Sequence, residues 1–201
     1  CIVGWVEGAL ALAAELRGIN ALMTDFYDDP DFVHDLLAFC ADVSILYAAA
    51  QVEAGADSIG MSDAAASLIG PGFYHDFLWS QQERILQAAT AAGAMTRVHM
   101  CGCTDPMLEN MARLPADIFE IDFLTDFTLA RQQLGTDRVL CGNIDTISTM
   151  LEGTATAVTA AATRCQQIGG ERHIVAPGCE VAPLTPPENV RALVDFARGL
   201  G

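Results

Sequence analysis

The residues best suited to bind a metal ion lie in the segment 97–103, RVHMCGC. The apolar run before it predicts that a β-strand ends here, and alternate strand residues point to the same side. His99 and Cys101 are therefore expected to project together. Cys179, in VAPGCEVAP, follows another apolar run 78 residues after Cys101. In a parallel sheet both segments lie at the carboxyl ends of the strands, where barrel enzymes place their active sites.

One nitrogen and two sulfur ligands are a typical zinc set, and three protein ligands leave one coordination position for substrate or water. Two thiolates and a neutral histidine around Zn2+ make a formally neutral centre, a weaker Lewis acid than a site of histidines alone. Such a centre favours holding a substrate thiolate as a nucleophile over making hydroxide. The alternative is that these residues only pack, as single histidines and cysteines at strand ends often do.

The remaining cysteines do not indicate a disulfide framework. The total of 7 is odd, the chain is not short, and several cysteines lie in apolar stretches, so a reducing cytoplasm is favoured. Cys103 is either a fourth ligand or a bystander on its loop, with the bystander favoured, and Cys40 and Cys165 are expected in the core. Cys141, in VLCGNID, is either a core residue or part of a pocket wall.

Polar side chains at other strand ends are the candidates for catalysis and substrate binding. Asp63, Glu120 and Asp122 are the candidate catalytic residues, and Asn143 and Cys141 are the candidate substrate-binding residues. Each acid has a structural alternative, because acids at strand ends also cap helices and buried acids also orient ligands from behind. Capping is an equally good interpretation for a further acid of this kind, Asp145.

One pattern, a short apolar run followed by a turn and a helical stretch, repeats six times and would position these residues. Continuous apolar runs are typical of parallel strands buried on both faces. Asp29-Pro30 predicts a helix start, Gly55 predicts its end, and Thr185-Pro186-Pro187-Glu188 predicts a capping box. The runs span residues 1–4, 57–62, 96–101, 117–123, 138–143 and 173–178.

Six strand–helix units predict a parallel α/β protein, either an open doubly wound sheet or a closed (β/α)8 TIM barrel. No nucleotide-binding glycine loop follows any run, which disfavours the usual open-sheet proteins. Because a barrel typically needs about 250 residues, residues 1–201 are expected to be a single domain covering roughly the last six units. The abrupt start without methionine agrees with an absent amino-terminal part.

The composition excludes several classes of protein. Hydrophobic residues are 52% and charged residues 18%, which excludes a disordered chain. The formal charge of −16 makes nucleic-acid and anionic-lipid partners poor candidates. No stretch approaches about eighteen uncharged apolar residues, so no membrane span is expected. The start of the chain lacks the basic region of a signal peptide, and a cytoplasmic location is expected.

Over nearly all of its length the chain resembles the uroporphyrinogen decarboxylase superfamily, and within it the zinc-dependent corrinoid methyltransferases. The zinc motif of that branch, His-x-Cys…Cys, falls on His99, Cys101 and Cys179. The true decarboxylases resemble the chain less, because they carry a Gly-His-Gly type sequence near Gly178-Cys179-Glu180 and an arginine-bearing amino-terminal segment. The segments that match are EAGADSIGMSDAAAS, VHMCGCTDPMLENMA, DIFEIDF, VLCGNIDT and APGCEVAPLTPPENVRALVDFAR.

The resemblance implies methyl transfer between a corrinoid (cobalamin) held by a partner protein and an acceptor. The acceptor is a thiol such as coenzyme M in one branch and tetrahydrofolate in another, and the sequence does not rank them. For tetrahydrofolate, Asp63, Glu120, Asp122 and Asn143 are candidates for a base or for orienting the pterin.

Two other functions stay open, a metal-free decarboxylase and a non-catalytic barrel that binds a corrinoid protein. The acidic surface predicts a corrinoid partner with a positive patch. The oligomeric state, a homo-oligomer included, is not indicated.

Overall fold

The computed structural model describes residues 1–200, in which parallel strands alternate with helices. Two compact units are found. The amino-terminal unit comprises residues 1–101 and 106–117, and the carboxy-terminal unit comprises residues 102–105 and those from Ile118 onward. The expectation of a single domain stays a prediction.

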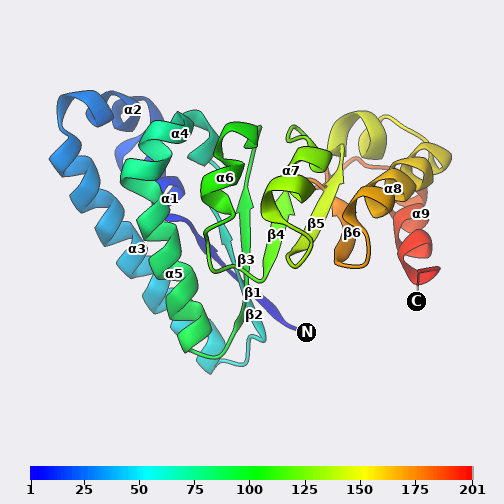
Figure 1. The fold of residues 1–201 in the computed structure, drawn as a ribbon, viewed down its shortest axis with the longest axis horizontal. Helices are drawn as coiled ribbons and strands as arrows, with labels where there is room; N and C mark the ends of the chain where they lie inside the picture. The colour runs from blue at the N-terminus through cyan, green and yellow to red at the C-terminus, as the bar shows by residue number, and fades with distance from the viewer. Residues whose placement is uncertain (201) are drawn as a thin grey trace. The chain divides into compact units, whose positions relative to one another are not determined.

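The sheet of the amino-terminal unit has the order β1-β2-β3, with all neighbours parallel. Helices α3 and α5 pack against each other and lie side by side in Figure 1. The strands are β1 (Val3–Glu7), β2 (Ser58–Ser62) and β3 (Met95–Met100). The helices are α1 (Ala9–Arg17), α2 (Ile19–Asp28), α3 (Pro30–Glu53), α4 (Gly70–Phe73), α5 (Trp79–Ala91) and α6 (Leu108–Met111), with short turns η1 (Ala66–Leu68) and η2 (Tyr74–Leu78) and, reaching into this unit, η3 (Asp105–Met107).

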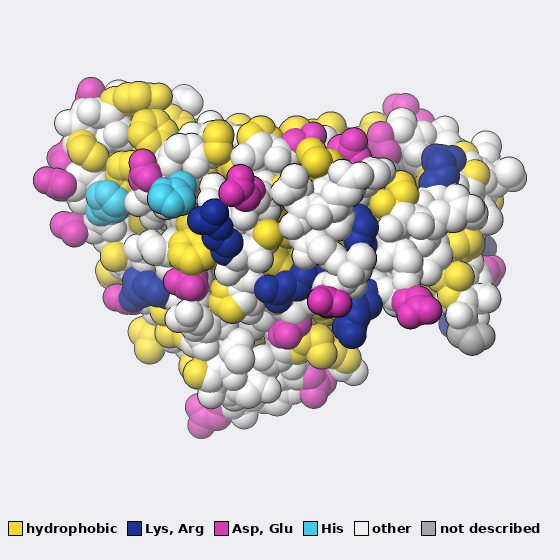
Figure 2. Space-filling model, viewed as in Figure 1, with side chains coloured by type: hydrophobic (Ala, Val, Ile, Leu, Met, Phe, Trp, Pro, Cys, Tyr) yellow, Lys and Arg dark blue, Asp and Glu magenta, His cyan; other side chains and the backbone are white. Residues whose placement is uncertain are grey.

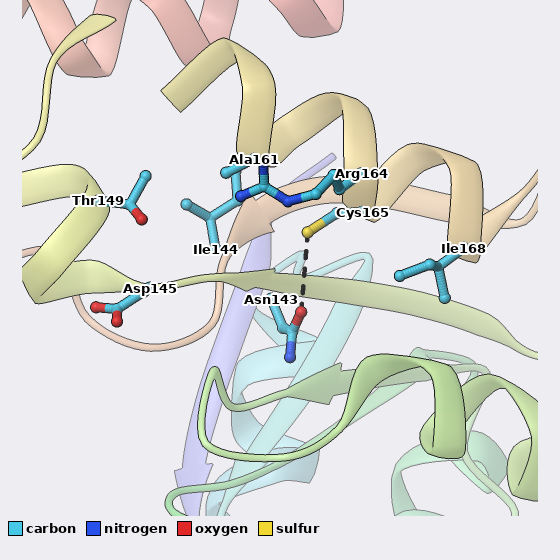
Figure 3. Close-up of a pocket in the computed structure, with 8 residues that line it drawn as sticks. All are labelled: Asn143, Ile144, Asp145, Thr149, Ala161, Arg164, Cys165 and Ile168. Atoms are coloured by element: carbon cyan, nitrogen blue, oxygen red, sulfur yellow. Dashed lines mark hydrogen bonds between the residues drawn. The ribbon is translucent and has the colours of Figure 1, made fainter. Parts of the chain in front are cut away.

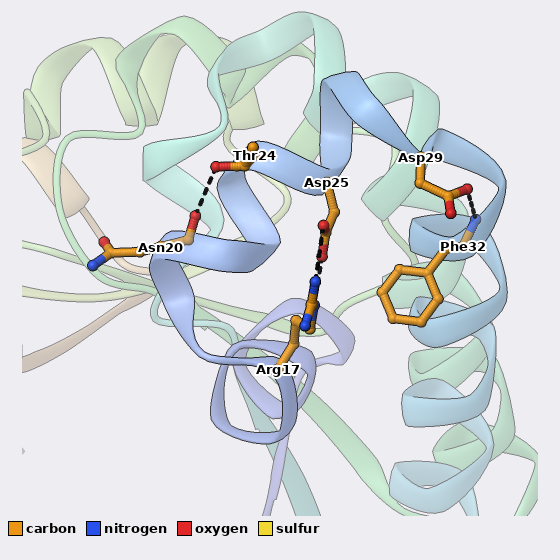
Figure 4. A network of polar contacts seen from close by, with 6 residues as sticks. All are labelled: Arg17, Asn20, Thr24, Asp25, Asp29 and Phe32. Carbon is orange, nitrogen blue, oxygen red and sulfur yellow. Dashed lines mark hydrogen bonds and ion pairs between the residues drawn. The ribbon is translucent and has the colours of Figure 1, made fainter.

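The predicted start of helix α3 is confirmed. The Asp29 carboxylate accepts a hydrogen bond from the Phe32 N–H at 3.2 Å, and Pro30 is the first helical residue (Figure 4). Just before this cap, the Arg17 guanidinium joins the end of α1 to α2 through both oxygens of Asp25, at 2.7 and 3.2 Å (Figure 4). This hydrogen bond lowers the pKa of Asp25. The chain therefore enters α3 from a well-fixed corner.

Helix α3 bears on the expectation that no membrane span is present, although Asp35 and Asp42 interrupt its apolar stretch. By length and composition it is long and apolar enough to cross a membrane, and 33% of its apolar window is buried. Its exposed side carries Phe39, Leu46 and Tyr47. One such helix is weak support for a membrane span, because core helices of soluble proteins meet the same criterion. Helix α3 packs on α5, α1, β1 and β2.

The sheet of the carboxy-terminal unit has the order β4-β5-β6, again parallel. Helix α8 packs on β5 and β6 and contacts α7 and α9. The predicted helix cap at Asp145 is confirmed, since its carboxylate accepts hydrogen bonds from the Ile147 and Ser148 N–H groups at 2.8 Å. The elements are β4 (Ile118–Ile121), α7 (Phe127–Leu134), β5 (Val139–Ile144), η4 (Thr146–Leu151), α8 (Ala155–Gly169), β6 (His173–Pro177) and α9 (Pro187–Arg198).

The predicted capping box before α9 is wrong. The helix begins at Pro187 with Pro186 as its N-cap, and no side chain caps it. The residue before a proline is disfavoured in helical conformation, and Pro186 is accordingly extended, with ψ of 130°. A capping box with Thr185 as the N-cap would start the helix at Pro186. Helix α9 starts one residue later, at Pro187.

All six predicted strands are present, five within two residues of their expected bounds. The first strand is displaced, because its pairing with β2 continues to the exposed Glu7, opposite Ser62. Cys40, Cys141 and Cys165 are buried. On the face shown in Figure 2, acidic side chains are scattered among apolar and uncharged ones rather than gathered into one patch.

Candidate functional site

In the amino-terminal unit, His99 and Cys101 project together as the strand pattern predicted. The His99 Nε2 atom lies 3.3 Å from the Cys101 Sγ atom. Their strand neighbours Val98 and Met100 are buried in the core, on the opposite face of β3. His99 is itself buried, whereas Cys101 is half-buried. The pair thus offers a nitrogen and a sulfur ligand from the end of one strand.

In the carboxy-terminal unit, Asp122 lies beside Cys179. Asp122 directly follows β4 and is buried, and the half-buried Cys179 follows β6. A carboxylate oxygen of Asp122 and the Cys179 Sγ atom lie within 4.8 Å of each other, and both atoms are of kinds that bind metal ions. Asp122 is a candidate catalytic residue by its sequence pattern, and its place beside this thiol was not predicted. The signal that could have indicated this contact is that both residues follow strands of the same parallel sheet.

The Asp122 carboxylate is also held by the backbone. One oxygen accepts a hydrogen bond from the Gly102 N–H at 2.9 Å, and the other accepts from the Leu124 N–H at 2.8 Å. Each carboxylate oxygen has a second lone pair. The side chain therefore fixes its surroundings while keeping acceptor capacity toward the cysteine.

Asp63 makes the contacts of a helix-capping residue. It is fully buried, and its carboxylate accepts hydrogen bonds from the Ala11 N–H of α1 at 2.8 Å and from Gln82 Nε2 at 3.0 Å. Gln82 in turn accepts from the Tyr74 hydroxyl at 2.8 Å. Burial raises the pKa of Asp63 to about 6 against the effect of these hydrogen bonds. Its catalytic role stays a prediction, and its contacts are those of the capping alternative.

Glu120 and Cys141 are partners in the register of the neighbouring strands β4 and β5. Their side chains therefore share one face of the carboxy-terminal sheet. Glu120 is half-buried and Cys141 is buried. The structure thus brings together a candidate catalytic residue and a candidate substrate-binding residue, and both roles stay predictions.

Asn143 uses its amide to hold the turn after β4. Its Nδ2 donates to the Asp122 carbonyl at 3.2 Å and to the Thr125 carbonyl at 2.9 Å, and its Oδ1 lies 3.8 Å from the Cys165 Sγ atom. Asn143 also lines a cavity of about 250 Å3 between β5 and α8, with Arg164 across it (Figure 3). Because both amide protons are engaged, only its carbonyl oxygen is left for a ligand, and the substrate-binding role stays a prediction.

The other histidines have structural contacts. His34 stacks on Phe77 at a ring distance of 4.2 Å, and His75 is exposed. At the amino end of β6, His173 pairs through Nε2 with the Gly142 carbonyl at 2.7 Å. Burial lowers the pKa of His173, so the neutral imidazole is the form that ties β6 to β5.

Parallel strands alternating with helices, with polar side chains where the strands end, define the chain as an α/β protein of the barrel class. The family model for uroporphyrinogen decarboxylase (URO-D) matches residues 1–200. The chain therefore belongs to the uroporphyrinogen decarboxylase family, as the resemblance predicted.

Known relatives include methyltransferases and decarboxylases. The chain is 32% identical over 199 residues to the methylcobamide:CoM methyltransferase MtbA of Methanosarcina mazei, covering 98% of this chain and 58% of that protein. It is 30% identical over 179 residues to a uroporphyrinogen decarboxylase of Nocardia farcinica, covering 87% of this chain and 50% of that protein.

A solved structure of a methyltransferase from Methanosarcina mazei matches with a TM-score of 0.90 and 31% identity, covering 99% of this chain and 58% of that one. The predicted fold class, successive strand–helix units of a (β/α)8 barrel, is thereby confirmed. The chain spans little more than half the length of these relatives.

Proposed function

We propose that this chain carries the metal-binding part of a zinc-dependent methyltransferase. The enzyme would move a methyl group between a corrinoid protein and a thiol such as coenzyme M. The observation that carries the proposal is the His99–Cys101 pair at the end of β3, with Nε2 and Sγ 3.3 Å apart. The methylcobamide:CoM methyltransferases among the relatives support the same activity.

The donor set fits zinc. His99, Cys101 and Cys179 would hold the ion with one imidazole nitrogen and two sulfurs, leaving a fourth position for the acceptor. The Asp122 carboxylate beside Cys179 is a further oxygen donor. Soft thiolate ligands select zinc over magnesium or calcium, which prefer oxygen.

Zinc, when bound, lowers the pKa of an acceptor thiol and keeps its sulfur nucleophilic. The protein's own residues supply the setting for this chemistry. His99 is buried, and Asp122 fixes the loop after Cys101 through its bond to Gly102. During transfer the acceptor forms a bond to the methyl carbon as the cobalt–carbon bond breaks, and the electron pair stays on cobalt.

If the acceptor is instead tetrahydrofolate, its nucleophile is a nitrogen, which gains reactivity by losing a proton to a base. Glu120 and Asp122 are the candidates for this base, because they are two residues apart at the end of β4 and so point to the same face. We propose a cytoplasmic location. We also propose a corrinoid-protein partner with a positive patch, because the chain carries 26 acidic against 10 basic residues.

Metal analysis of the purified protein tests the proposal. We expect about one zinc per chain, lost in both His99→Ala and Cys179→Ala. The matched controls are His75→Ala and Cys1→Ala, which remove an exposed histidine and an exposed cysteine. Zinc retained at full stoichiometry in His99→Ala and Cys179→Ala would contradict the assignment.

The acceptor is tested in the whole protein with methylcobalamin as donor and coenzyme M or tetrahydrofolate as acceptor. Methylated coenzyme M is the expected product. Methylation of tetrahydrofolate alone would move the proposal to the folate branch. Release of carbon dioxide from uroporphyrinogen by metal-free protein would establish a decarboxylase instead. Binding of a methylated corrinoid protein with no turnover of either acceptor would indicate a non-catalytic barrel.

A further inference from the structure

We propose that the turn between β4 and α7, residues 122–126, positions both the loop that follows Cys101 and the residue that precedes Cys179, with Thr125 as its central positioning residue. This inference rests on the proposed function, because it concerns the two cysteines that would bind zinc. The turn forms hydrogen bonds with residues 102–105, which follow Cys101, and packs against Gly178, which precedes Cys179.

Residues 102–105, which directly follow Cys101, are held by hydrogen bonds to this turn. The Thr125 Oγ1 atom accepts from the Thr104 N–H at 2.9 Å and donates to the Gly102 carbonyl at 3.1 Å. The Gly102 N–H donates to Asp122 at 2.9 Å. Both peptide groups of Gly102 are thereby fixed, so the direction in which the chain leaves Cys101 is fixed as well.

The hydroxyl of Thr125 is fully used. Because it donates to the Gly102 carbonyl, the Thr104 hydroxyl, 3.0 Å away, must be the donor in the contact between the two threonines. Thr104 and Thr125 are both almost completely buried. Loss of the Thr125 hydroxyl would therefore leave the buried Thr104 N–H and the part-buried Gly102 carbonyl without this partner.

The turn also limits where the chain passes before Cys179. Gly178 lies against the peptide that joins Asp122 to Phe123, so close that a Cβ added at Gly178 would overlap the Phe123 nitrogen. The Gly178 N–H donates to the Ile144 carbonyl at 2.8 Å, which holds the glycine in this place. Asn143 supports the turn from β5 by donating to the Asp122 and Thr125 carbonyls.

The test uses the whole protein and compares Thr125→Val, which keeps the shape and removes the hydroxyl, with Thr125→Ser, which restores it. Thr163→Val is the matched control, because Thr163 is exposed on helix α8 and its hydroxyl donates to the Thr159 carbonyl of the same helix. Zinc affinity is measured by competition with a chromophoric chelator, and ligand geometry is measured by the visible spectrum of the Co2+-substituted protein.

We expect Thr125→Val to bind zinc about 10- to 100-fold more weakly, the usual effect of losing a residue that orients metal ligands. Its cobalt bands should shift and weaken, while Thr125→Ser and Thr163→Val should match the unmodified protein. Equal zinc affinity and an unchanged cobalt spectrum in Thr125→Val would overturn the proposal. Should Thr125→Val fail to fold, Asn143→Ser decides, with an expected loss of about tenfold in zinc affinity.

Amide hydrogen exchange in the metal-free protein separates this proposal from the proposed function. Removing the Thr125 hydroxyl should speed exchange at Gly102 and Thr104 by about tenfold, and Thr125→Ser should not. A protein that binds no zinc would contradict the proposed function, and exchange would then decide the role of the turn alone. Unchanged exchange in Thr125→Val would overturn that role.

Discussion

Asp63 and Asp122 occupy the same position relative to a strand but differ in what surrounds them. Each directly follows a parallel strand, β2 and β4 respectively, and each accepts hydrogen bonds from backbone N–H groups. Asp63 faces the start of helix α1 and the side chain of Gln82. Asp122 faces a loop and lies beside the thiol of Cys179. The position after a strand therefore places a carboxylate without determining its role.

The largest expected effect is that of the buried Asp63 on the pH dependence of stability. Burial raises the pKa of Asp63 from 3.8 to about 6, so the folded state takes up a proton between these values. The free energy of unfolding should therefore fall as pH rises from about 4 to about 6, by on the order of 3 kcal/mol. Urea unfolding across this range, compared between the unmodified protein and Asp63→Asn, measures the effect.

Asp145→Asn is the control for this measurement, with the opposite sign. Partial burial acts to raise the pKa of Asp145, but hydrogen bonds from Ser148 and Ile147 lower it overall. Its contribution to stability should be lost as pH falls. A difference between unmodified protein and Asp63→Asn that is constant with pH would show that Asp63 does not titrate in this range.

A second test uses the glycine that packs against each aspartate. A Cβ at Gly8 would overlap the Asp63 carboxylate, and a Cβ at Gly178 would overlap the backbone after Asp122. Each alanine substitution should cost about 1–3 kcal/mol of stability, as overpacking does. Only Gly178→Ala should also weaken zinc binding. Equal zinc affinities in the two variants would remove the distinction between the two regions.

The smallest effects should come from aspartates that only cap helices. Asp29 and Asp126 accept hydrogen bonds from the first turns of α3 and α7 with exposed carboxylates. Replacing either with alanine should cost about 1 kcal/mol and leave zinc affinity unchanged. Thermal unfolding and chelator competition measure both quantities. A change in zinc affinity in Asp126→Ala would extend the positioning role of the β4–α7 turn to its last residue.

The sequence predicted features that depend on neighbours along the chain. The period of a strand placed His99 beside Cys101, and Asp29-Pro30 located the start of α3, because each signal lies within a few residues. The capping box failed for a local reason as well, since the restriction that Pro187 places on Pro186 outweighed the capping pattern.

The contacts that distinguish Asp63 from Asp122 depend on distant segments. Asp63 meets Ala11 from 52 residues away, and Asp122 meets Gly102 from 20 residues away. No periodic pattern in the sequence predicts these two contacts. Each acid therefore kept both a catalytic and a structural interpretation. The role of Thr125 was missed for the same reason, because a threonine in a turn carries no signal of which loop it will bind.

The shared contacts of the β4–α7 turn have a consequence for how this chain can change in evolution. Surface loops usually tolerate insertions and deletions. Here, one added residue between Asp122 and Asp126 would displace the supports of Gly102 and Gly178 together. We therefore expect related chains that keep both cysteines to vary in the amino acids of this loop more readily than in its length.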